Sequence, residues 1–139
     1  LTVDSEPQAD VVILDTIGEL AHLFQVATAV FVGGSLVDHG GHNILEPAVH
    51  GKAIVFGPHM QNFAEIATTF VRHQAAMQVQ SPAGLSQAWV RLVSDPAERT
   101  RLGAAARGLV EANRGAKPRT LAVVADLLPP AGPRLVRAR

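Results

Sequence analysis

The sequence of 139 residues contains no cysteine and only one tryptophan, and neither sign of charge is in excess. The absence of cysteine excludes disulfide bonds, a catalytic thiol and a thiolate metal site. Twelve Lys and Arg residues balance twelve Asp and Glu residues, so the net charge is zero. Proteins that bind the nucleic-acid backbone normally present a cationic surface, and we therefore expect no nucleic-acid partner.

Long apolar runs are also missing. No stretch approaches the length of a transmembrane helix, and the opening LTVDSEPQAD lacks the basic and apolar regions of a signal peptide. We therefore expect this chain to be soluble, and its abrupt start suggests a fragment of a longer protein. The hydrophobic content of 47% is typical of a globular domain with one core. Residues 129–139, which begin with PPAGP, are expected to form a disordered tail.

Short apolar runs alternate with segments of helical periodicity. The runs predict strands at residues 11–14, 29–32, 53–56 and 76–79. They are continuous rather than alternating, as in strands that helices cover on both faces. Helical spacing occurs in each interval, and three further helices are predicted at residues 85–94, 96–113 and 118–128. The fold class is thus α/β, a Rossmann-like parallel sheet with helices on both faces that ends in helices.

A capping side chain precedes a glutamate by three residues at four places, which is the sequence pattern of a capping box. These pairs are Thr16 and Glu19, Asn43 and Glu46, Asn62 and Glu65, and Asp95 and Glu98. The first three follow predicted strands, so their helices should begin at the carboxyl edge of the sheet, where open α/β folds bind ligands. Helix N-termini at this edge favour an anion.

The stretch VGGSLVDHGGHNILEP, residues 32–47, places four glycines between a predicted strand and a predicted helix. Such a junction favours a phosphate or sugar ligand, because bare backbone permits close approach. The pattern is neither GxGxxG nor a P-loop. The alternative is a long mobile loop without a ligand. Glu46 and Glu19 either close their own helix caps or accept hydroxyl hydrogen bonds from a ribose, and the residues alone leave both roles open.

The remaining polar candidates carry weaker signals. His39 and His42 have no clear third ligand, so local hydrogen bonds are favoured over a zinc site. His59 follows the predicted strand at 53–56 and is a better candidate for a polar site. Ser35 lacks the GxSxG elbow of a nucleophile, and no complete nucleophilic set is present. Trp89 is expected to pack in the core or against another domain.

Three blocks together resemble one family. They are DTIGEL at 15–20, FVGGSLV at 31–37 with GGHNILEP at 40–47, and FGPH at 56–59 with Asn62 and Phe63. Their order and spacing resemble the C-terminal part of the bacterial 3-deoxy-D-manno-octulosonic acid (Kdo) transferases. The similarity covers about residues 10 to 128. It implies that residues 1–128 form part of a C-terminal Rossmann-like nucleotide-sugar-binding domain of a GT-B glycosyltransferase.

The resemblance also assigns residues to the donor CMP-Kdo. Matches to the first nucleotide-contacting segment, the glycine loop and the second segment are, in chain order, Ile17, Gly18, Glu19, Gly33, Gly34, Ser35, Gly41, Asn43, Ile44, Leu45 and Glu46. It implies that Glu46 binds the ribose and that the helix starting at Asn43 directs its N–H groups toward the donor phosphate. Family members often carry a basic residue near Asp38 and His39, where this sequence has none.

The activity implied is transfer of Kdo from CMP-Kdo to the lipid A precursor in lipopolysaccharide biosynthesis, with no cofactor and no metal. The family places the acceptor site, the catalytic base and a membrane anchor in an N-terminal domain, at the cytoplasmic face of the inner membrane of Gram-negative bacteria. We therefore expect no catalytic residue in this chain, and expect it to be inactive alone. The alternatives are a GT-B domain that uses a UDP-sugar and a non-catalytic nucleotide-binding module.

Overall fold

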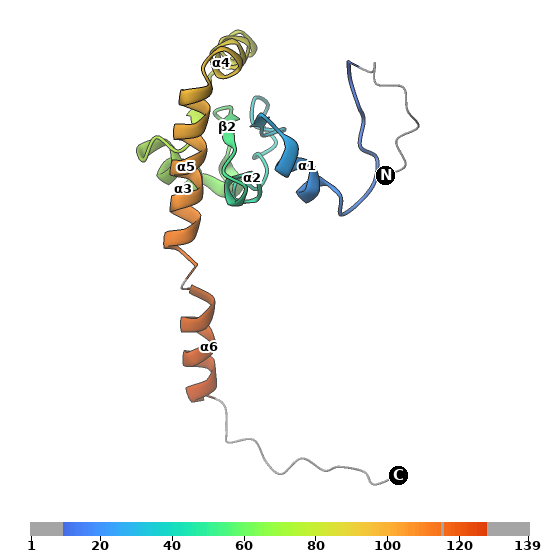
Figure 1. Ribbon diagram of the computed structural model, residues 1–139. Helices are drawn as coiled ribbons and strands as arrows, with labels where there is room; N and C mark the ends of the chain where they lie inside the picture. The colour runs from blue at the N-terminus through green and yellow to red at the C-terminus, as the bar shows by residue number, and fades with distance from the viewer. Residues whose placement is uncertain (1–9, 115, 128–139) are drawn as a thin grey trace.

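The computed structural model describes residues 10–114 and 116–127 (Figure 1). Helices and strands alternate through the first half, and helices follow. In chain order the elements are α1 Leu20–Val26, β1 Ala29–Phe31, α2 Leu45–Val49, β2 Ala53–Phe56, the 3-10 turn η1 Gln61–Phe63, α3 Ala64–Arg72, β3 Met77–Gln78, α4 Pro82–Ser94, α5 Pro96–Ala112 and α6 Ala116–Leu127.

The three strands form one parallel sheet in the order β1-β2-β3. Ala29 pairs with Ala53 at one side of β2, and Val55 pairs with Met77 at the other. All four residues of β2 are buried, as the central strand of a sheet covered on both faces should be. The strands predicted at 29–32, 53–56 and 76–79 are therefore confirmed.

Side chains of β2 alternate between two cores. Ile54 and Phe56 join the core beneath α2, α3 and α5, whereas Val55 joins a second core with Leu92 of α4. Trp89 of α4 is half-buried against this second core, which agrees with the expectation that it packs in the interior. Helices thus cover both faces of a parallel sheet, and the predicted fold class is confirmed.

Helix α5 packs closely against the turn between α2 and β2. Gly103 and Gly51 meet at this crossing, where a Cβ on Gly103 would overlap the carbonyl oxygen of Gly51. Gly51 itself has φ of +63°, a backbone conformation that glycine adopts without strain. The absence of a side chain at Gly103 therefore sets the distance between α5 and α2.

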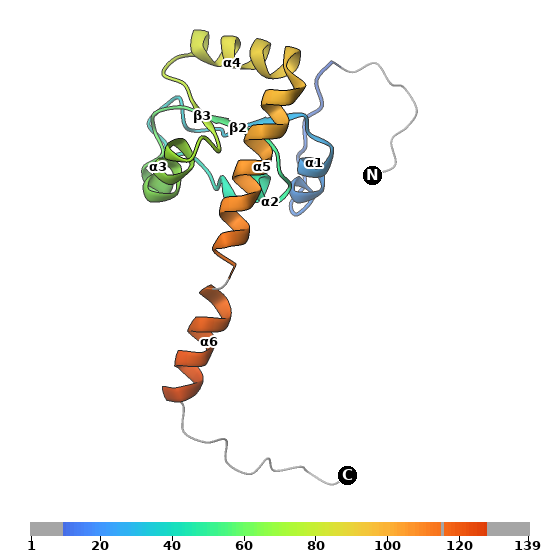
Figure 2. The same cartoon turned by 60° about the vertical axis from the view of Figure 1, so that its left-hand side comes forward.

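The prediction of a strand at 11–14 is wrong. Residues 10–19 form no helix or strand, bend at 16–18 and stand apart from the sheet (Figures 1 and 2). Val11, Val12 and Ile13 are 78%, 81% and 85% exposed. A strand requires a neighbouring strand to satisfy its N–H and C=O groups, and this run pairs with no described strand. Local β-branched composition could not supply that partner.

The capping boxes have mixed outcomes. Asp95 caps α5 as predicted, because its Oδ1 accepts a hydrogen bond from the Glu98 N–H at 2.9 Å. Thr16 does not cap a helix, since α1 begins only at Leu20 and the Thr16 hydroxyl donates to the Glu19 carboxylate. Asn62 does not cap α3 either, because it lies inside η1 and its side chain donates to the His39 carbonyl in the loop after β1.

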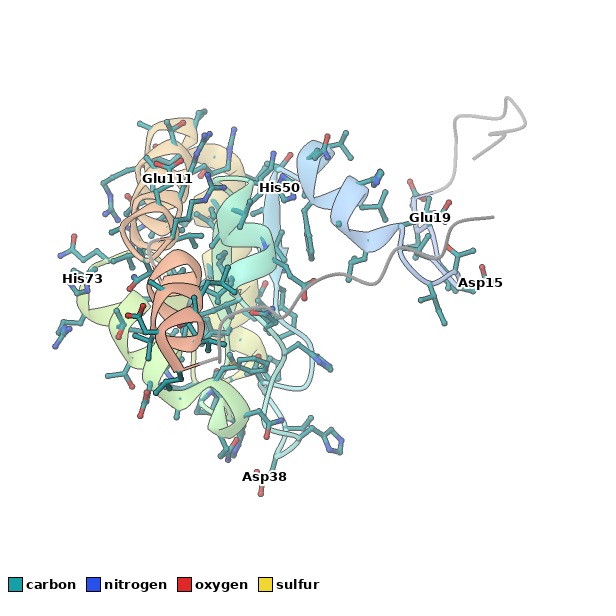
Figure 3. All side chains as sticks on the ribbon, turned by 90° about the horizontal axis from the view of Figure 1, so that it is seen from below. Asp15, Glu19, Asp38, His50, His73 and Glu111 are labelled. Carbon is teal, nitrogen blue, oxygen red and sulfur yellow. The ribbon has the colours of Figure 1, made fainter. Side chains whose placement is uncertain are left out.

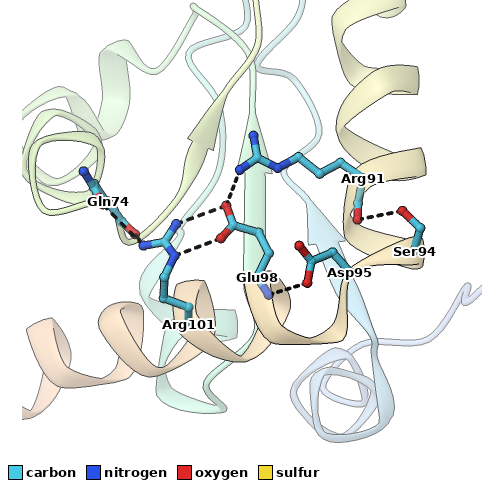
Figure 4. A network of polar contacts seen from close by, with 6 residues as sticks. All are labelled: Gln74, Arg91, Ser94, Asp95, Glu98 and Arg101. Atoms are coloured by element: carbon cyan, nitrogen blue, oxygen red, sulfur yellow. Dashed lines mark hydrogen bonds and ion pairs between the residues drawn. The ribbon is translucent and has the colours of Figure 1, made fainter.

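A polar network joins three elements around Glu98 (Figure 4). Its carboxylate accepts from Arg91 of α4 at 2.8 Å and from Arg101 of α5 at 2.8 and 3.1 Å. Arg101 also reaches the Gln74 carbonyl in the turn before β3, at 3.3 Å. The hydrogen bonds from Arg101 are the largest cause that lowers the pKa of Glu98. Desolvation, the next largest, opposes them, and the charges of both arginines with the Arg91 hydrogen bond add to the lowering. The network therefore connects α4 and α5 to each other and to the turn that precedes the edge strand β3.

The last described helix, α6, extends beyond α5 and away from the sheet (Figures 1 and 2). It confirms the helix predicted at 118–128, except for residue 128, which with the predicted tail at 129–139 lies outside the described residues. Within 10–114 and 116–127, no helix combines the length and apolarity needed to cross a bilayer.

Candidate functional site

A cleft of about 430 Å³ opens at the carboxyl end of β1. Its walls are apolar except along one rim, where Gly33, His42, Asn43 and Glu46 are gathered. The residues that line it are Leu20, Phe24, Val30, Phe31, Val32, Gly33, His42, Asn43, Glu46, Pro47 and Phe63. An apolar cleft with a few convergent polar groups at a sheet edge is the usual form of a small-molecule site.

Asn43 orients the Glu46 side chain at this rim. The Asn43 Oδ1 accepts from the Leu45 N–H at 3.0 Å, and its Nδ2 donates to Glu46 Oε1 at 3.1 Å. The N-cap of α2 is Ile44 rather than Asn43 as predicted, so Asn43 lies one residue before the cap and accepts from the first helical N–H. Among the described residues no group donates to Glu46 Oε2, which leaves that oxygen available to a hydroxyl. Glu46 therefore fulfils part of a capping role and retains a free acceptor.

Ser35 joins the loop after β1 to the loop after β2. Its side chain is completely buried, donates to the Val32 carbonyl at 2.5 Å and accepts from the Gly57 N–H at 2.8 Å. The Ser35 carbonyl accepts from the His59 N–H at 2.9 Å. Both capacities of the hydroxyl are thus used inside the protein, and Ser35 holds the two loops in register.

Gly40 and Gly41 are buried in the contact between the same loops. Both have positive φ, of +82° and +68°. A Cβ on Gly40 would overlap the Asn62 side chain, and a Cβ on Gly41 would overlap Met60 Sδ. Backbone bonds reinforce this contact, since the Asn62 N–H donates to the Gly40 carbonyl at 3.1 Å. These two glycines thus make room for the neighbouring loop, whereas Gly33 is exposed and lines the cleft.

The histidines of this edge have different surroundings. His59 Nδ1 lies 3.7 Å from Asp38 Oδ1, and Gln61 donates to the same carboxylate oxygen at 2.9 Å. His39 and His59 are not among the residues that line the cleft, whereas His42 is exposed there. Sequence reasoning weighed His42 as a metal ligand and favoured a local hydrogen bond, but not a place in the cleft, although its position beside Asn43 at the predicted edge was a signal that could have identified it. No group of three His, Asp or Glu residues within the described chain could hold a metal ion.

The structure does not bring Ile17, Gly18 and Glu19 to the cleft. Ile17 is fully exposed, and the three residues stand before α1 in the segment that does not join the sheet. Figure 3 shows Glu19 far from Asp38, which marks the tip of the loop after β1. The expectation that this segment lies at the carboxyl edge depended on a strand at 11–14. The contact of these residues with a nucleotide was implied by the family resemblance and stays a prediction.

Of the remaining predicted residues, Ile44 is buried in the core and Leu45 packs against it. Gly34 has φ of +67°, lies beside His42 and accepts a hydrogen bond from the Gly41 N–H at 3.2 Å. The structure therefore gathers Gly33, Asn43 and Glu46 in one cleft, with Gly34, Ser35, Gly41, Ile44 and Leu45 around or beneath them.

No family model matches the sequence. A 3-deoxy-D-manno-octulosonic acid transferase of Haemophilus influenzae is 40% identical over 86% of this chain and 27% of its own length. The transferase of the same name from Bordetella pertussis is 33% identical over 88% of this chain and 28% of its own length. The chain thus spans about a quarter of the length of the curated relatives it matches.

A solved structure agrees with these relatives. It is the C-terminal CMP-Kdo binding domain of WaaA from Acinetobacter baumannii, which is 34% identical and superposes with a TM-score of 0.66 over 70% of this chain and 51% of that one. Fold and cleft define an α/β domain with a cleft at the carboxyl edge of its sheet. The chain is a homologue of the 3-deoxy-D-manno-octulosonic acid transferases, in their C-terminal part. The family resemblance found from the sequence is confirmed.

Proposed function

We propose that this chain binds CMP-Kdo and is the donor-binding part of a glycosyltransferase that transfers Kdo to the lipid A precursor. The observation that carries the proposal is the cleft beside β1, in which Asn43 holds one oxygen of Glu46 and leaves the other free. Support comes from the relative whose C-terminal domain is described as CMP-Kdo binding. The cytosine would lie in the cleft against its apolar walls, and Glu46 would accept hydrogen bonds from the ribose hydroxyls.

In the reaction, an acceptor hydroxyl attacks the anomeric carbon of Kdo. The bond from that carbon to the phosphate oxygen breaks, and CMP departs with the electron pair. The hydroxyl proton passes to a base that the family resemblance assigns to an N-terminal domain. The contribution of the described residues is to hold and orient the donor. In the complete protein we place this reaction at the cytoplasmic face of the inner membrane, with the acceptor bound outside this chain.

The direct test is a titration of the ¹⁵N-labelled chain with CMP, UMP and UDP. We expect CMP to shift the amide signals of Gly33 and of residues 42–46, with weaker effects of both uridine nucleotides. Preferential binding of UDP would favour a UDP-sugar transferase instead. Shifts confined to residues outside the cleft at millimolar CMP would refute a nucleotide site at β1.

The role of Glu46 has a matched control. Glu46→Gln keeps an oxygen for Asn43 but presents an amide to the ribose, so CMP affinity should fall roughly tenfold or more, as expected for lost hydrogen bonds to a charged acceptor. The melting temperature should barely change, because glutamine also serves in capping boxes. Glu65→Gln alters the first turn of α3, outside the cleft, and should leave CMP affinity unchanged.

A sugar analogue sharpens this test. Deoxy-CMP lacks the 2′-hydroxyl, so the wild-type chain should bind it more weakly than CMP if Glu46 contacts the ribose. In Glu46→Gln the preference for CMP over deoxy-CMP should disappear. A variant that loses stability yet retains both affinity and preference would assign Glu46 to the helix cap alone.

A further inference from the structure

The cleft presents an electrostatic difficulty for the ligand proposed above. A nucleotide phosphate is an anion, yet none of the described residues that line the cleft is Lys or Arg. The two loops at this edge, residues 33–43 and 57–63, contain no Lys or Arg either. The nearest carboxylates to be considered, Glu46 and Asp38, would repel a phosphate rather than attract it. The start of α2, which the resemblance assigns to the phosphate, offers few donors, because the Leu45 N–H is bonded to Asn43 and Pro47 has no N–H. A side-chain donor is therefore needed as well.

We propose that His42 binds the phosphate of the nucleotide, an inference that rests on the proposed function. Among the side chains that line the cleft, His42 is the only one whose ring can carry a positive charge. Even a neutral imidazole retains one N–H, so it can donate to a phosphate oxygen in either tautomer. Hydrogen bonds from nitrogen to an ionised oxygen are among the stronger ones in proteins.

The surroundings of His42 leave its ring free for this role. It lies over the bare backbone of Gly33 and Gly34, where a Cβ built on Gly34 would be 3.7 Å from His42 Nε2. Among the described residues, no hydrogen bond engages either ring nitrogen of His42. The other side-chain donor at the rim, the Asn43 amide, gives one of its two N–H groups to Glu46 and is thereby held beside a carboxylate that would repel a phosphate. The His42 ring thus lies against two residues that have no side chain, and neither of its nitrogens is engaged within the described residues.

The other histidines of this edge are less suited. His59 lies beside Asp38, whose carboxylate would compete with a phosphate for its ring. His39 is exposed but is not among the residues lining the cleft. One ligand can instead contact both His42 and Glu46, because both line the same cleft. We therefore assign the phosphate to His42 and the ribose to Glu46.

The experiment compares CMP with cytidine, which lacks the phosphate, by calorimetric or NMR titration of the 139-residue chain. In His42→Ala, CMP affinity should fall about tenfold, the loss expected for a hydrogen bond to a charged group. Cytidine affinity should stay within about twofold of wild type, since the base and ribose contacts remain. His42→Gln should recover part of the CMP affinity, because its amide also donates an N–H. His39→Ala, in the same loop, is the matched control and should bind both ligands as wild type does.

The outcomes separate the two proposals. If the wild-type chain binds neither CMP nor cytidine, the proposed function fails. If it binds CMP but His42→Gln and His42→Ala both retain full CMP affinity, or lose CMP and cytidine equally, only the assignment of His42 is overturned. A selective loss of CMP in His39→Ala instead would move the phosphate contact to that ring.

Discussion

Two glycines of α5 provide a test with opposite expected signs. Gly103 is buried against the turn between α2 and β2, whereas Gly108 is exposed and a Cβ there meets nothing within 4 Å. Replacing a helical glycine by alanine stabilises a protein by about 0.5–1 kcal/mol, because the unfolded chain loses conformational freedom. Gly108→Ala should therefore increase the free energy of unfolding by about that amount.

Gly103→Ala gains the same helix propensity but places a methyl group on the Gly51 carbonyl oxygen. This partner is backbone, so it cannot rotate away, and α5 or the turn must shift. Overpacking of this kind costs about 1–3 kcal/mol. The net result should be destabilisation by up to about 2.5 kcal/mol, opposite in sign to the effect of Gly108→Ala.

Urea denaturation measures both variants. Trp89 fluorescence reports the core beneath α4, and far-ultraviolet circular dichroism reports the helices. The urea midpoint should rise for Gly108→Ala and fall for Gly103→Ala, with similar m-values. A Gly103→Ala protein as stable as Gly108→Ala would refute the close approach of α5 to the turn.

Three further predictions follow from the polar contacts. Ser35→Ala should lower the free energy of unfolding by about 1–3 kcal/mol, because the buried Gly57 N–H loses its acceptor. Ser81→Ala, which removes the cap of α4, should lower it by about 1 kcal/mol. Thermal melts compare the two variants, and equal losses would show that the buried hydroxyl of Ser35 contributes no more than an ordinary helix cap. Because the folded-state pKa of Glu98 is lowered, the stability that its carboxylate contributes is present above the unfolded-state pKa of about 4.5 and is lost as pH falls through the folded-state pKa. Glu98→Gln should lower the free energy of unfolding by up to about 1 kcal/mol near neutral pH, and its melting temperature should approach that of wild type in more acidic buffers. A difference in melting temperature that stays constant at every pH would contradict this. Asn43→Ala should remove about 1 kcal/mol through the lost cap and also weaken CMP binding through Glu46; intact affinity in calorimetry would show that Glu46 needs no orientation.

The parts of the fold that the sequence predicted are those set by local pattern. The apolar run at 53–56 is buried on both faces, and the pattern that begins at Asp95 caps α5 as expected. These features depend on residues close together in the chain. The prediction of a strand at 11–14 was wrong because strand pairing is nonlocal. Without that strand, Ile17, Gly18 and Glu19 do not lie at the cleft.

The candidate site was predicted in outline but not in its division of roles. The glycine loop at the carboxyl edge is where the cleft lies, and Glu46 lines it. The sequence could not show that Gly40 and Gly41 face Asn62 and Met60, about twenty residues further along. Nor could it show that the hydroxyl of Ser35 is consumed by backbone groups. Such roles depend on how two loops meet, and no local pattern records that.

The hydrogen bonds that hold the loop after β1 also affect how the free energy of ligand binding divides between enthalpy and entropy. Ordering one residue costs about 1–2 kcal/mol of conformational entropy, and a free loop would lose this freedom when a nucleotide entered. Here the bonds through Ser35, Gly40 and Gly57 fix the loop before any ligand arrives. Calorimetry should therefore find a small entropic penalty for CMP in this chain. The conformational entropy of this loop is lost when the protein folds, and not when the nucleotide binds.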